Sequence, residues 1–223
     1  MKTQIIYEDD VLLVCYKPAG IPVQTASIAT QDVVSELKNY LAERENKNPY
    51  LAVIHRLDQP VSGILVFGKQ KEAAADLSNQ VQDGRMNKQY KALVNGVLEP
   101  KEAVLEHFLE KDVKTNKSYV AASGKKSKLF YKVEKELEKD GEIYSQIAIK
   151  LYTGRHHQIR VQMAAVGHPI LGDTKYGTMN KASSLKLCAC ELMFIHPKTK
   201  KEMKFAVSDL PWSTDEEILL IKQ

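Results

Sequence analysis

The sequence predicts an α+β fold with a largely antiparallel sheet, and two observations support this prediction. Strand-like segments dominate, and most come in pairs across short turns, such as 4–16 and 129–138 with 142–152. A few amphipathic stretches lie between these pairs, and no linker, repeat or low-complexity segment divides the chain. Strands joined by hairpins, with helices between them, are typical of one α+β domain. We therefore expect a single domain over residues 1–223.

Each predicted element has a local reason. Residues 4–7 and 11–16 are apolar and flank an acidic turn, which predicts a hairpin. Residues 32–45 predict an amphipathic helix that Thr30 or Asp32 can cap. The later predicted elements are a helix over 71–83, a strand over 90–98, a hairpin turn at Asp140-Gly141, a helix over 155–166, and strands over 186–195 and 201–207. The polar, lysine-dense segment 110–128 is predicted as a mobile insertion.

Composition is that of an ordinary globular protein with a mild basic excess. Hydrophobic residues make up 43%, charged residues 27%, and the formal net charge is +4. This charge permits nucleic-acid binding without proving it. Only five of the 32 basic residues are arginine, and three of these lie within 55–67 and 153–161. Arginine offers a planar donor fork where lysine offers a solvated point charge, so these two segments are candidates for specific contacts.

Neither a membrane segment nor a disulfide framework is expected. No apolar run approaches the roughly 20 residues of a membrane span, and the N-terminus lacks a signal pattern. We therefore expect a cytoplasmic protein with no membrane partner. The three cysteines are Cys15, Cys188 and Cys190, and their odd number argues for buried thiols.

One polar segment between two apolar runs is a candidate site. The apolar run 51–54 leads into His-Arg-Leu-Asp-Gln-Pro at 55–60, and the apolar run 61–67 follows. This pattern predicts a strand, a tight loop and a second strand. Such a loop can present Arg56 and Asp58 on a rigid scaffold. From the spacing alone, Asp58 can be a nucleophile or one half of an ordinary loop ion pair.

This segment is one of several motifs that follow one another in a recognisable order. They are Lys-Pro-Ala-Gly-Ile-Pro-Val at 17–23, His-Arg-Leu-Asp with Ser-Gly at 55–63, Lys-Gln-Tyr-Lys-Ala-Leu-Val at 88–94, Thr-Gly-Arg-His-His-Gln-Ile-Arg-Val at 153–161, and Gly-His-Pro-Ile-Leu-Gly-Asp with Tyr-Gly at 167–177. In these motifs the chain resembles the RluA family of RNA pseudouridine synthases, from about residue 5 to about residue 211.

The resemblance implies a fold, an activity and catalytic residues. The implied fold is a mixed, mainly antiparallel sheet with flanking helices and a central RNA-binding cleft, here without a separate N-terminal RNA-binding module. The implied activity is isomerisation of specific uridines in ribosomal or transfer RNA. By resemblance, Asp58 is the nucleophile, Tyr90 stacks on the flipped base, and Arg160 pairs with the aspartate. Arg56 corresponds to the residue that fills the gap left by the flipped base.

The same side chains also have structural interpretations. Tyr90 lies in a predicted strand and can serve packing, and Arg160 can cap the carbonyl end of its own helix. His156 and His157 are adjacent, so on a helix they point about 100° apart and cannot chelate one metal together. They are interpreted as RNA-facing or structural, and His55 as a hydrogen-bonded loop residue.

The predicted RNA contacts extend around the catalytic positions. They are Arg56, His55, Lys17, Lys88, Arg155, His156, Lys125 and Lys126. For the lysines at 17, 125 and 126, a solvated lysine face is an equally good interpretation. Val61 and Gln162 depart from the family pattern, where threonine and histidine are common, and they bear on substrate fit more than on catalysis.

The expected partner is structured RNA, a ribosomal or transfer RNA stem-loop, bound by a monomer. No cofactor and no metal are expected, because the reaction is redox-neutral and the sequence has no phosphate-binding glycine loop or His/Cys cluster. One alternative is a non-catalytic RNA-binding or RNA-remodelling protein on the same fold, although a carboxylate at Asp58 would repel RNA. Another is a hydrolase using Asp58 with His55 or His156, for which the sequence supplies no oxyanion site.

Overall fold

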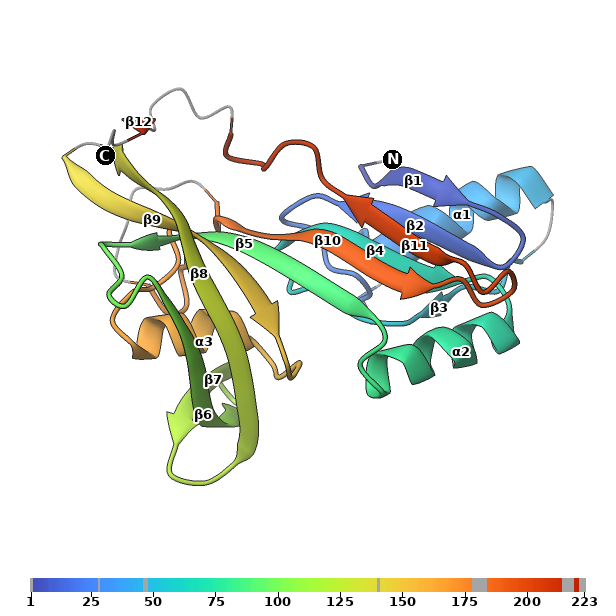
Figure 1. Ribbon diagram of the computed structural model, residues 1–223. Coiled ribbons are helices and arrows are strands. Elements are labelled where there is room, and N and C mark those ends of the chain that lie inside the picture. The colour runs from blue at the N-terminus through green and yellow to red at the C-terminus, as the bar shows by residue number, and fades with distance from the viewer. Residues whose placement is uncertain are drawn as a thin grey trace. The chain divides into compact units, whose positions relative to one another are not determined.

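The chain folds into two compact units, each built on antiparallel strand pairs (Figure 1). The computed structural model describes residues 2–27, 29–45, 48–139, 141–177, 184–213 and 219–220. Unit 1 comprises Met1–Lys88 with Ala189–Ser208, and unit 2 comprises Gln89–Cys188 with Asp209–Gln223. The α+β class is confirmed, whereas one domain over the whole chain stays a prediction. In the described ranges no helix is long and apolar enough to cross a membrane.

Unit 1 contains a sheet that follows the predicted hairpin pattern. Its strands run in the order β1 (Gln4–Glu8), β2 (Leu12–Lys17), β4 (Ser62–Gly68) and β10 (Leu187–Ile195), with β3 (Ala52–Val53) beside β4 and β11 (Glu202–Ala206) beside β10. The pairs β1–β2, β2–β4, β3–β4 and β10–β11 are antiparallel. The predicted hairpin at 4–16 and the predicted strands at 186–195 and 201–207 are therefore confirmed.

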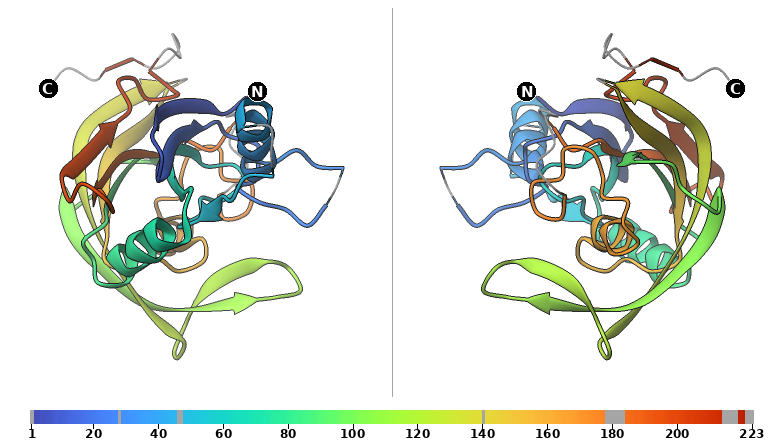
Figure 2. Two further views of the ribbon diagram at one scale, coloured as in Figure 1. Left: turned by 90° about the vertical axis from the view of Figure 1, so that its right-hand side faces the viewer. Right: turned by 90° about the vertical axis from the view of Figure 1, so that its left-hand side faces the viewer.

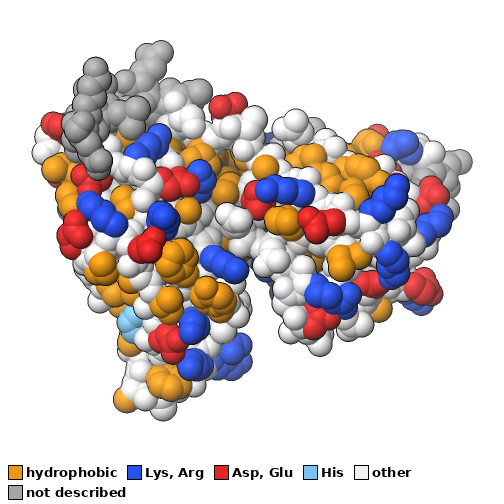
Figure 3. Space-filling model, in the orientation of Figure 1, with side chains coloured by type: hydrophobic (Ala, Val, Ile, Leu, Met, Phe, Trp, Pro, Cys, Tyr) orange, Lys and Arg blue, Asp and Glu red, His pale blue; other side chains and the backbone are white. Residues whose placement is uncertain are grey.

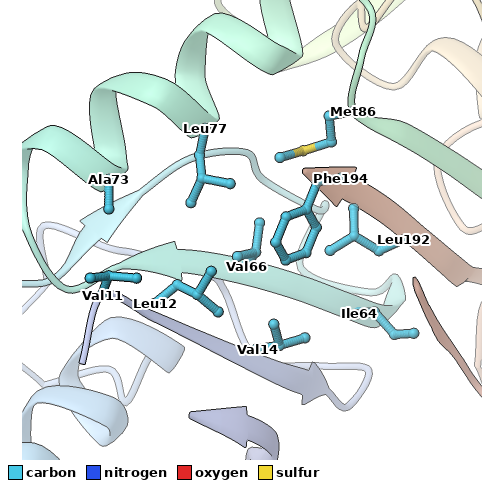
Figure 4. Packing of buried hydrophobic residues seen from close by; sticks show 10 residues of the cluster. All are labelled: Val11, Leu12, Val14, Ile64, Val66, Ala73, Leu77, Met86, Leu192 and Phe194. Carbon is cyan, nitrogen blue, oxygen red and sulfur yellow. The ribbon is translucent and has the colours of Figure 1, made fainter. Parts of the chain in front are cut away.

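Two helices supply the apolar surface that this sheet needs. Helix α1 (Val33–Glu45) begins where predicted, because Asp32 Oδ1 accepts the N–H of Ser35 at 2.7 Å. Helix α2 (Lys71–Gln82) ends just before Gly84, which has a φ of +78°. Its Ala73 and Leu77 point into the core cluster (Figure 4). The buried residues of this cluster are Val11, Leu12, Val14, Ile64, Val66, Ala73, Leu77, Met86, Leu192 and Phe194.

Burial in unit 1 involves both faces of its central strands. Every residue of β4 is buried, and so are Leu13 and Cys15, which alternate with the core residues of β2. Continuous burial of this kind explains why the sequence around 61–67 is apolar without alternation. Cys15, Cys188 and Cys190 are buried free thiols, as predicted.

Unit 2 contains a further run of antiparallel strands and, among its described residues, one helix. Its strands run in the order β5 (Asn87–Asn95), β9 (Glu142–Leu151), β8 (Lys125–Lys139), β6 (Glu102–Asp112) and β7 (Lys117–Ala121), with β12 (Leu219–Leu220) beside β8. Figure 2 shows β8 as a long, curved strand, and its pairing with β9 shifts register between Val133 and Lys135. The β8–β9 hairpin was predicted, but its turn residue Asp140 lies outside the described residues.

The segment 110–128, which was predicted as a mobile insertion, contains regular strands. This stretch holds the end of β6, all of β7 and the start of β8, and the strand over 102–112 was also missed. Asp112 organises the β6–β7 turn by accepting the N–H of Lys114 at 2.8 Å and the hydroxyl of Thr115 at 2.8 Å. The hairpin is largely exposed, so ladder hydrogen bonds rather than an apolar face specify it.

Helix α3 (Gln158–Ala165) begins three residues later than predicted. The side chain of Gln158 folds back, accepts the N–H of Arg155 at 3.0 Å, and donates to the carbonyl of Lys128 at 3.1 Å. His157 has a left-handed φ of +53°, which prevents α3 from starting earlier in the sequence. The placement of His156 and His157 on a helix was therefore wrong, and their rings stack with centroids 3.7 Å apart.

Candidate active site

Asp58 lies where a tight loop joins β3 to β4, as the strand–loop–strand pattern predicted. Its carbonyl accepts the N–H of Val61 at 3.0 Å, which closes the turn. Next to it, Gln59 exchanges two hydrogen bonds with Gly20, at 2.9 Å through its carbonyl and at 3.0 Å through its side-chain amide. The loop is thereby fixed to the segment that follows β2, and the half-buried Asp58 stands on a rigid support.

Lys17 ties this loop together from inside the protein. Its side chain has no exposed surface, and its ammonium donates to the carbonyls of Ile21 at 2.7 Å, Pro18 at 3.0 Å and Gln59 at 3.0 Å. Burial lowers the pKa of Lys17 to about 8, against the opposing charge of Asp58. Three carbonyl contacts occupy the three donors of an ammonium, which favours a structural role over the predicted RNA contact.

Gly63, in the Ser-Gly pair after the loop, allows β4 to approach a neighbouring segment closely. A Cβ atom at Gly63 would lie 2.5 Å from the carbonyl oxygen and 2.6 Å from the Cβ of Ala189. Its φ is +140°, a conformation that other residues rarely adopt. The glycine therefore fixes the start of the strand that leaves the Asp58 loop.

The other predicted residues of unit 1 differ in exposure. Arg56 is exposed, with its nearest hydrogen-bond contact to Gln24 at 3.4 Å, so its guanidinium is available to a ligand. His55 is buried, and neither ring nitrogen has a hydrogen-bond partner in the described part of the chain. Burial, and then the charge of Lys88, hold the pKa of His55 well below its usual value, so the imidazole is neutral. The expectation of a hydrogen-bonded His55 was wrong.

In unit 2, Tyr90 and Arg160 are both buried side chains. Tyr90 lies on β5 opposite Ile149 of β9. Arg160, on α3, donates from Nε to Asp173 Oδ2 at 2.8 Å and from Nη2 to Asp173 Oδ1 at 2.7 Å. Arg160 therefore forms an ion pair with Asp173, and the interpretation as a cap of its own helix loses its basis. Its guanidinium also lies over the ring of Tyr176, 5.2 Å from the centroid.

Asp173 is held ionised by what surrounds it. Burial alone raises the pKa of its carboxyl, but the hydrogen bonds and charge of Arg160 outweigh burial and keep that pKa below its usual value. Its Oδ1 also accepts the N–H groups of Lys175 at 2.9 Å and Tyr176 at 3.1 Å. No role was predicted for Asp173 or Tyr176, although they belong to the Gly-Asp and Tyr-Gly pairs of the last motif.

An open hollow of about 540 Å³ in unit 2 brings three predicted RNA-binding residues together. Its lining consists of Leu109, Glu110, Lys111, Ser118, Gly124, Lys125, Gly154, Arg155 and His156. Arg155 and Lys125 are exposed, and His156 contacts Ser118 Oγ through Nδ1 at 2.9 Å. The positive side chains and the size of the hollow suit a phosphate-bearing ligand.

Several other lysines of unit 2 are paired with carboxylates. Figure 3 shows cationic and anionic side chains interspersed over unit 2. Lys126 and Lys128 lie 3.2 Å and 2.6 Å from the two oxygens of Glu106. Lys126 was a predicted RNA contact, and this shared carboxylate offsets part of its charge. Exposed pairs of this kind contribute little to stability, so they leave the lysines free to exchange partners.

Gln162, one of the two departures from the family pattern, is fully buried and structural. Its Nε2 donates to the carbonyl of Leu105 at 3.2 Å and lies 3.0 Å from Nδ1 of His107, which links α3 to β6. Val61, the other departure, is buried at the end of the Asp58 loop. Neither residue is an exposed group that a ligand would meet first.

The predicted catalytic residues are divided between the two units. Asp58 belongs to unit 1, and Tyr90 and Arg160 belong to unit 2. The pairing of Arg160 with Asp58 therefore stays a prediction. Among the described residues, no group of three or more His, Cys, Asp or Glu side chains is placed to hold a metal ion.

Comparison with known proteins identifies the family. The family model described as RNA pseudouridylate synthase matches residues 11–165. The chain is 34% identical over 204 residues to a dual-specificity RNA pseudouridine synthase RluA from Vibrio parahaemolyticus, covering 88% of this chain and 79% of the relative. It is 32% identical over 213 residues to a ribosomal large subunit pseudouridine synthase C from Buchnera aphidicola, covering 89% of this chain and 65% of the relative.

A solved structure shows the same fold. The human RNA pseudouridylate synthase domain containing 1 superposes with a TM-score of 0.81 at 23% identity, covering 98% of this chain and 89% of that one. The fold and the family match define the class, which is that of the pseudouridine synthases, enzymes that are isomerases. The chain belongs to the RluA family of RNA pseudouridine synthases.

Proposed function

We propose that this protein converts a uridine of ribosomal or transfer RNA to pseudouridine, with Asp58 as the nucleophile. The strongest evidence for this proposal is that the Asp58 loop is held rigidly. A buried lysine and a reciprocal pair of hydrogen bonds hold that loop at the end of a buried strand. A charged side chain on a loop held this firmly is suited to chemistry that requires fixed geometry.

The reaction is balanced without a redox partner. The bond between N1 of the base and C1′ of the ribose breaks, and a bond between C5 and C1′ forms. The C5 proton leaves to solvent, and N1 gains a proton. A carboxylate such as Asp58 suits the first step because it can stabilise or trap the electron-poor sugar.

Tyr90 and Arg160 complete the proposed catalytic set. A guanidinium beside Asp58 would keep the carboxylate ionised and fix its direction. Tyr90 would stack on the released uracil and hold it near the sugar while it turns. Both side chains are buried, and burial restricts the number of orientations that each can adopt.

The target nucleotide must leave its stack, because its glycosidic bond is out of reach inside a helix. The exposed Arg56 is proposed to fill the gap that the flipped base leaves. Lys125, Arg155 and His156 are proposed to contact the RNA backbone beside the hollow that they line. A cytoplasmic location and a monomeric state accompany this proposal as expectations.

Two relatives carry names that point to the substrate class. One is named for the ribosomal large subunit, and the other is named a dual-specificity RNA enzyme. We therefore propose a stem-loop in ribosomal or transfer RNA as the substrate.

Pseudouridine mapping tests this proposal in cells. Total RNA from cells with and without the gene is treated with a reagent whose pseudouridine adduct stalls reverse transcription. A stop that is lost with the gene and restored by the wild-type protein, but not by Asp58→Asn, would give substrate and nucleophile together. Restoration by the Asp58→Asn variant would exclude Asp58 as the nucleophile.

A further inference from the structure

We propose that Tyr176 is a positioning residue for Arg160, and that it fixes the guanidinium with respect to strand β7. The proposal rests on the catalytic role proposed for Arg160. It assigns to Tyr176 an effect on the rate of the chemical step, transmitted through Arg160, instead of a contact with the substrate.

Two contacts restrain the guanidinium in different directions. Asp173 holds one edge of the group through two hydrogen bonds, 2.8 Å from Nε and 2.7 Å from Nη2. Tyr176 lies against the face, with its ring centroid 5.2 Å from the central carbon of the guanidinium. The carboxylate limits sliding within the plane of the guanidinium, and the aromatic ring limits tilting out of that plane.

The ring of Tyr176 is itself anchored through its hydroxyl. Its Oη accepts the backbone N–H of Ser118 at 2.7 Å and lies 2.7 Å from Nδ1 of His157. Its ring also meets the imidazole of His157 edge-on, with centroids 5.5 Å apart. An aromatic ring held only by apolar neighbours can tilt, whereas this ring is tied to a strand and to the residue that precedes α3.

His157, the partner of the Tyr176 hydroxyl, is held in a strained backbone conformation. His157 adopts a left-handed φ of +53°, which is unfavourable for a residue with a Cβ atom. Burial, then the nearby charges of Arg160, His156 and Lys175, lower its pKa to about 3, against the opposing effect of Asp173. The imidazole is therefore neutral, and it adds no second cation beside Arg160.

The second partner of the Tyr176 hydroxyl is strand β7, which lies at the end of the strand order. Ser118 lies on β7, which among the described strands pairs with β6 alone, and its outward N–H donates to Tyr176 instead of to a neighbouring strand. Ser118 also lines the hollow with Arg155 and contacts His156 through Oγ at 2.9 Å. A purely structural interpretation follows from this contact: Tyr176 could dock the β6–β7 hairpin without affecting Arg160.

The two interpretations predict different measurements. If Tyr176 only docks the β6–β7 hairpin, its loss would weaken RNA binding or folding. The rate of the chemical step on bound RNA would then stay unchanged. If it positions Arg160, its loss would slow the chemical step on RNA that is already bound, with little change in affinity. Single-turnover kinetics with enzyme in excess separates these two quantities.

The test compares Tyr176→Phe with a matched tyrosine variant in the same unit. Tyr176→Phe keeps the ring over Arg160 and removes the hydroxyl. Tyr131→Phe is the control, because the hydroxyl of this buried tyrosine donates to the carbonyl of Pro100 at 2.9 Å, away from Arg160. The probe is ribosomal and transfer RNA transcribed with 5-tritiated uridine, whose label is released to water when C5 bonds to the sugar.

We expect Tyr176→Phe to lower the single-turnover rate by about 10-fold to 100-fold, since small misplacements of catalytic groups cost about that much. We expect its RNA dissociation constant to stay within about 2-fold of wild type, and Tyr131→Phe to match wild type in rate. Equal rates for the two tyrosine variants, with Arg160→Ala inactive, would overturn the positioning role and leave the proposed function intact. An active Arg160→Ala would instead overturn the catalytic role of Arg160 and this proposal with it.

Discussion

Arg160 and Asp173 form a buried ion pair in which two parallel hydrogen bonds join the guanidinium to the carboxylate. The side chain of Arg160 is 3% exposed and that of Asp173 is not exposed at all. Without such a partner, burying Arg160 would cost much folding free energy, because an isolated charge in the interior loses its hydration. The pair explains how Arg160 can be both buried and charged.

Replacing Asp173 by asparagine should strongly destabilise the protein. The variant removes the carboxylate charge of Asp173 from the buried cation of Arg160, and breaking a buried pair on one side typically costs about 3–5 kcal/mol. Urea unfolding of wild type and Asp173→Asn measures the loss. Glu102→Gln is the control, since Glu102 is in an exposed pair with Lys132 at 3.3 Å and should leave the midpoint nearly unchanged. Equal midpoints for all three proteins would show that the pair contributes nothing.

Lys17→Met tests whether Lys17 supports the Asp58 loop or contacts RNA. Methionine keeps the length of the side chain but leaves three carbonyls, one buried and two half-buried, without their donor, which should cost about 1–3 kcal/mol in unfolding free energy. We also expect a slower single-turnover reaction at unchanged RNA affinity. The exposed Lys71→Met is the matched control. Weaker RNA binding at an unchanged rate would favour the RNA contact instead.

The same variant should change how stability depends on pH. Folded Lys17 has a pKa of about 8, below the value of about 10.4 for an unfolded lysine. Between these values the unfolded chain binds more protons than the folded one, so this group makes stability rise with pH, by up to about 3 kcal/mol. Unfolding curves from pH 7 to pH 10 should therefore rise less steeply for Lys17→Met. Parallel curves would mean that folded Lys17 keeps its proton.

Gly63→Ala should damage the strand that leaves the Asp58 loop. The new Cβ would lie 2.5 Å from a backbone oxygen of Ala189, which cannot move as a flexible side chain can. The left-handed φ adds a strain of about 1–3 kcal/mol. Gly154→Ala is a suitable comparison, because its Cβ would have no neighbour within 4 Å. Thermal unfolding should separate the two variants clearly, and similar melting temperatures would disprove the close packing at Gly63.

The hollow in unit 2 predicts a specific salt dependence of RNA binding. Lys125→Ala with Arg155→Ala should weaken binding and lower the slope of log affinity against log salt by about 1 to 2, since each lost phosphate contact removes about 0.7–0.9. Lys198→Ala with Lys204→Ala, two exposed lysines of unit 1, is the control. An unchanged slope for the first pair would remove these residues from the RNA interface.

Much of the fold could be predicted because local patterns agree with it. The hairpin at 4–16, the capped helix α1 and the apolar strand β4 each follow from residues close in sequence. Strands β6 and β7 were missed because their apolar residues, such as Val104, Leu105, Phe108 and Leu109, lie on both faces, one exposed and one half-buried. Their side chains therefore lack the apolar alternation that marks a half-buried strand.

The candidate site shows a similar limit. The motifs identified Asp58, Tyr90 and Arg160, but not the partner of Arg160, because Asp173 lies 13 residues away and only folding brings the two side chains together. For a related reason, the burial of Lys17 was not predicted. A lysine is usually exposed, and nothing near it in sequence indicates that three carbonyls will surround its ammonium.

The central claim is that Asp58 carries out pseudouridine formation, and tritium release tests it most directly. Purified wild type and Asp58→Asn are incubated with ribosomal and transfer RNA transcribed with 5-tritiated uridine, and RNA affinity is measured in parallel. We predict release by wild type only, with the variant binding RNA as tightly or more tightly, since it lacks a charge that repels phosphate. Appreciable release by Asp58→Asn would contradict the assignment of the nucleophile.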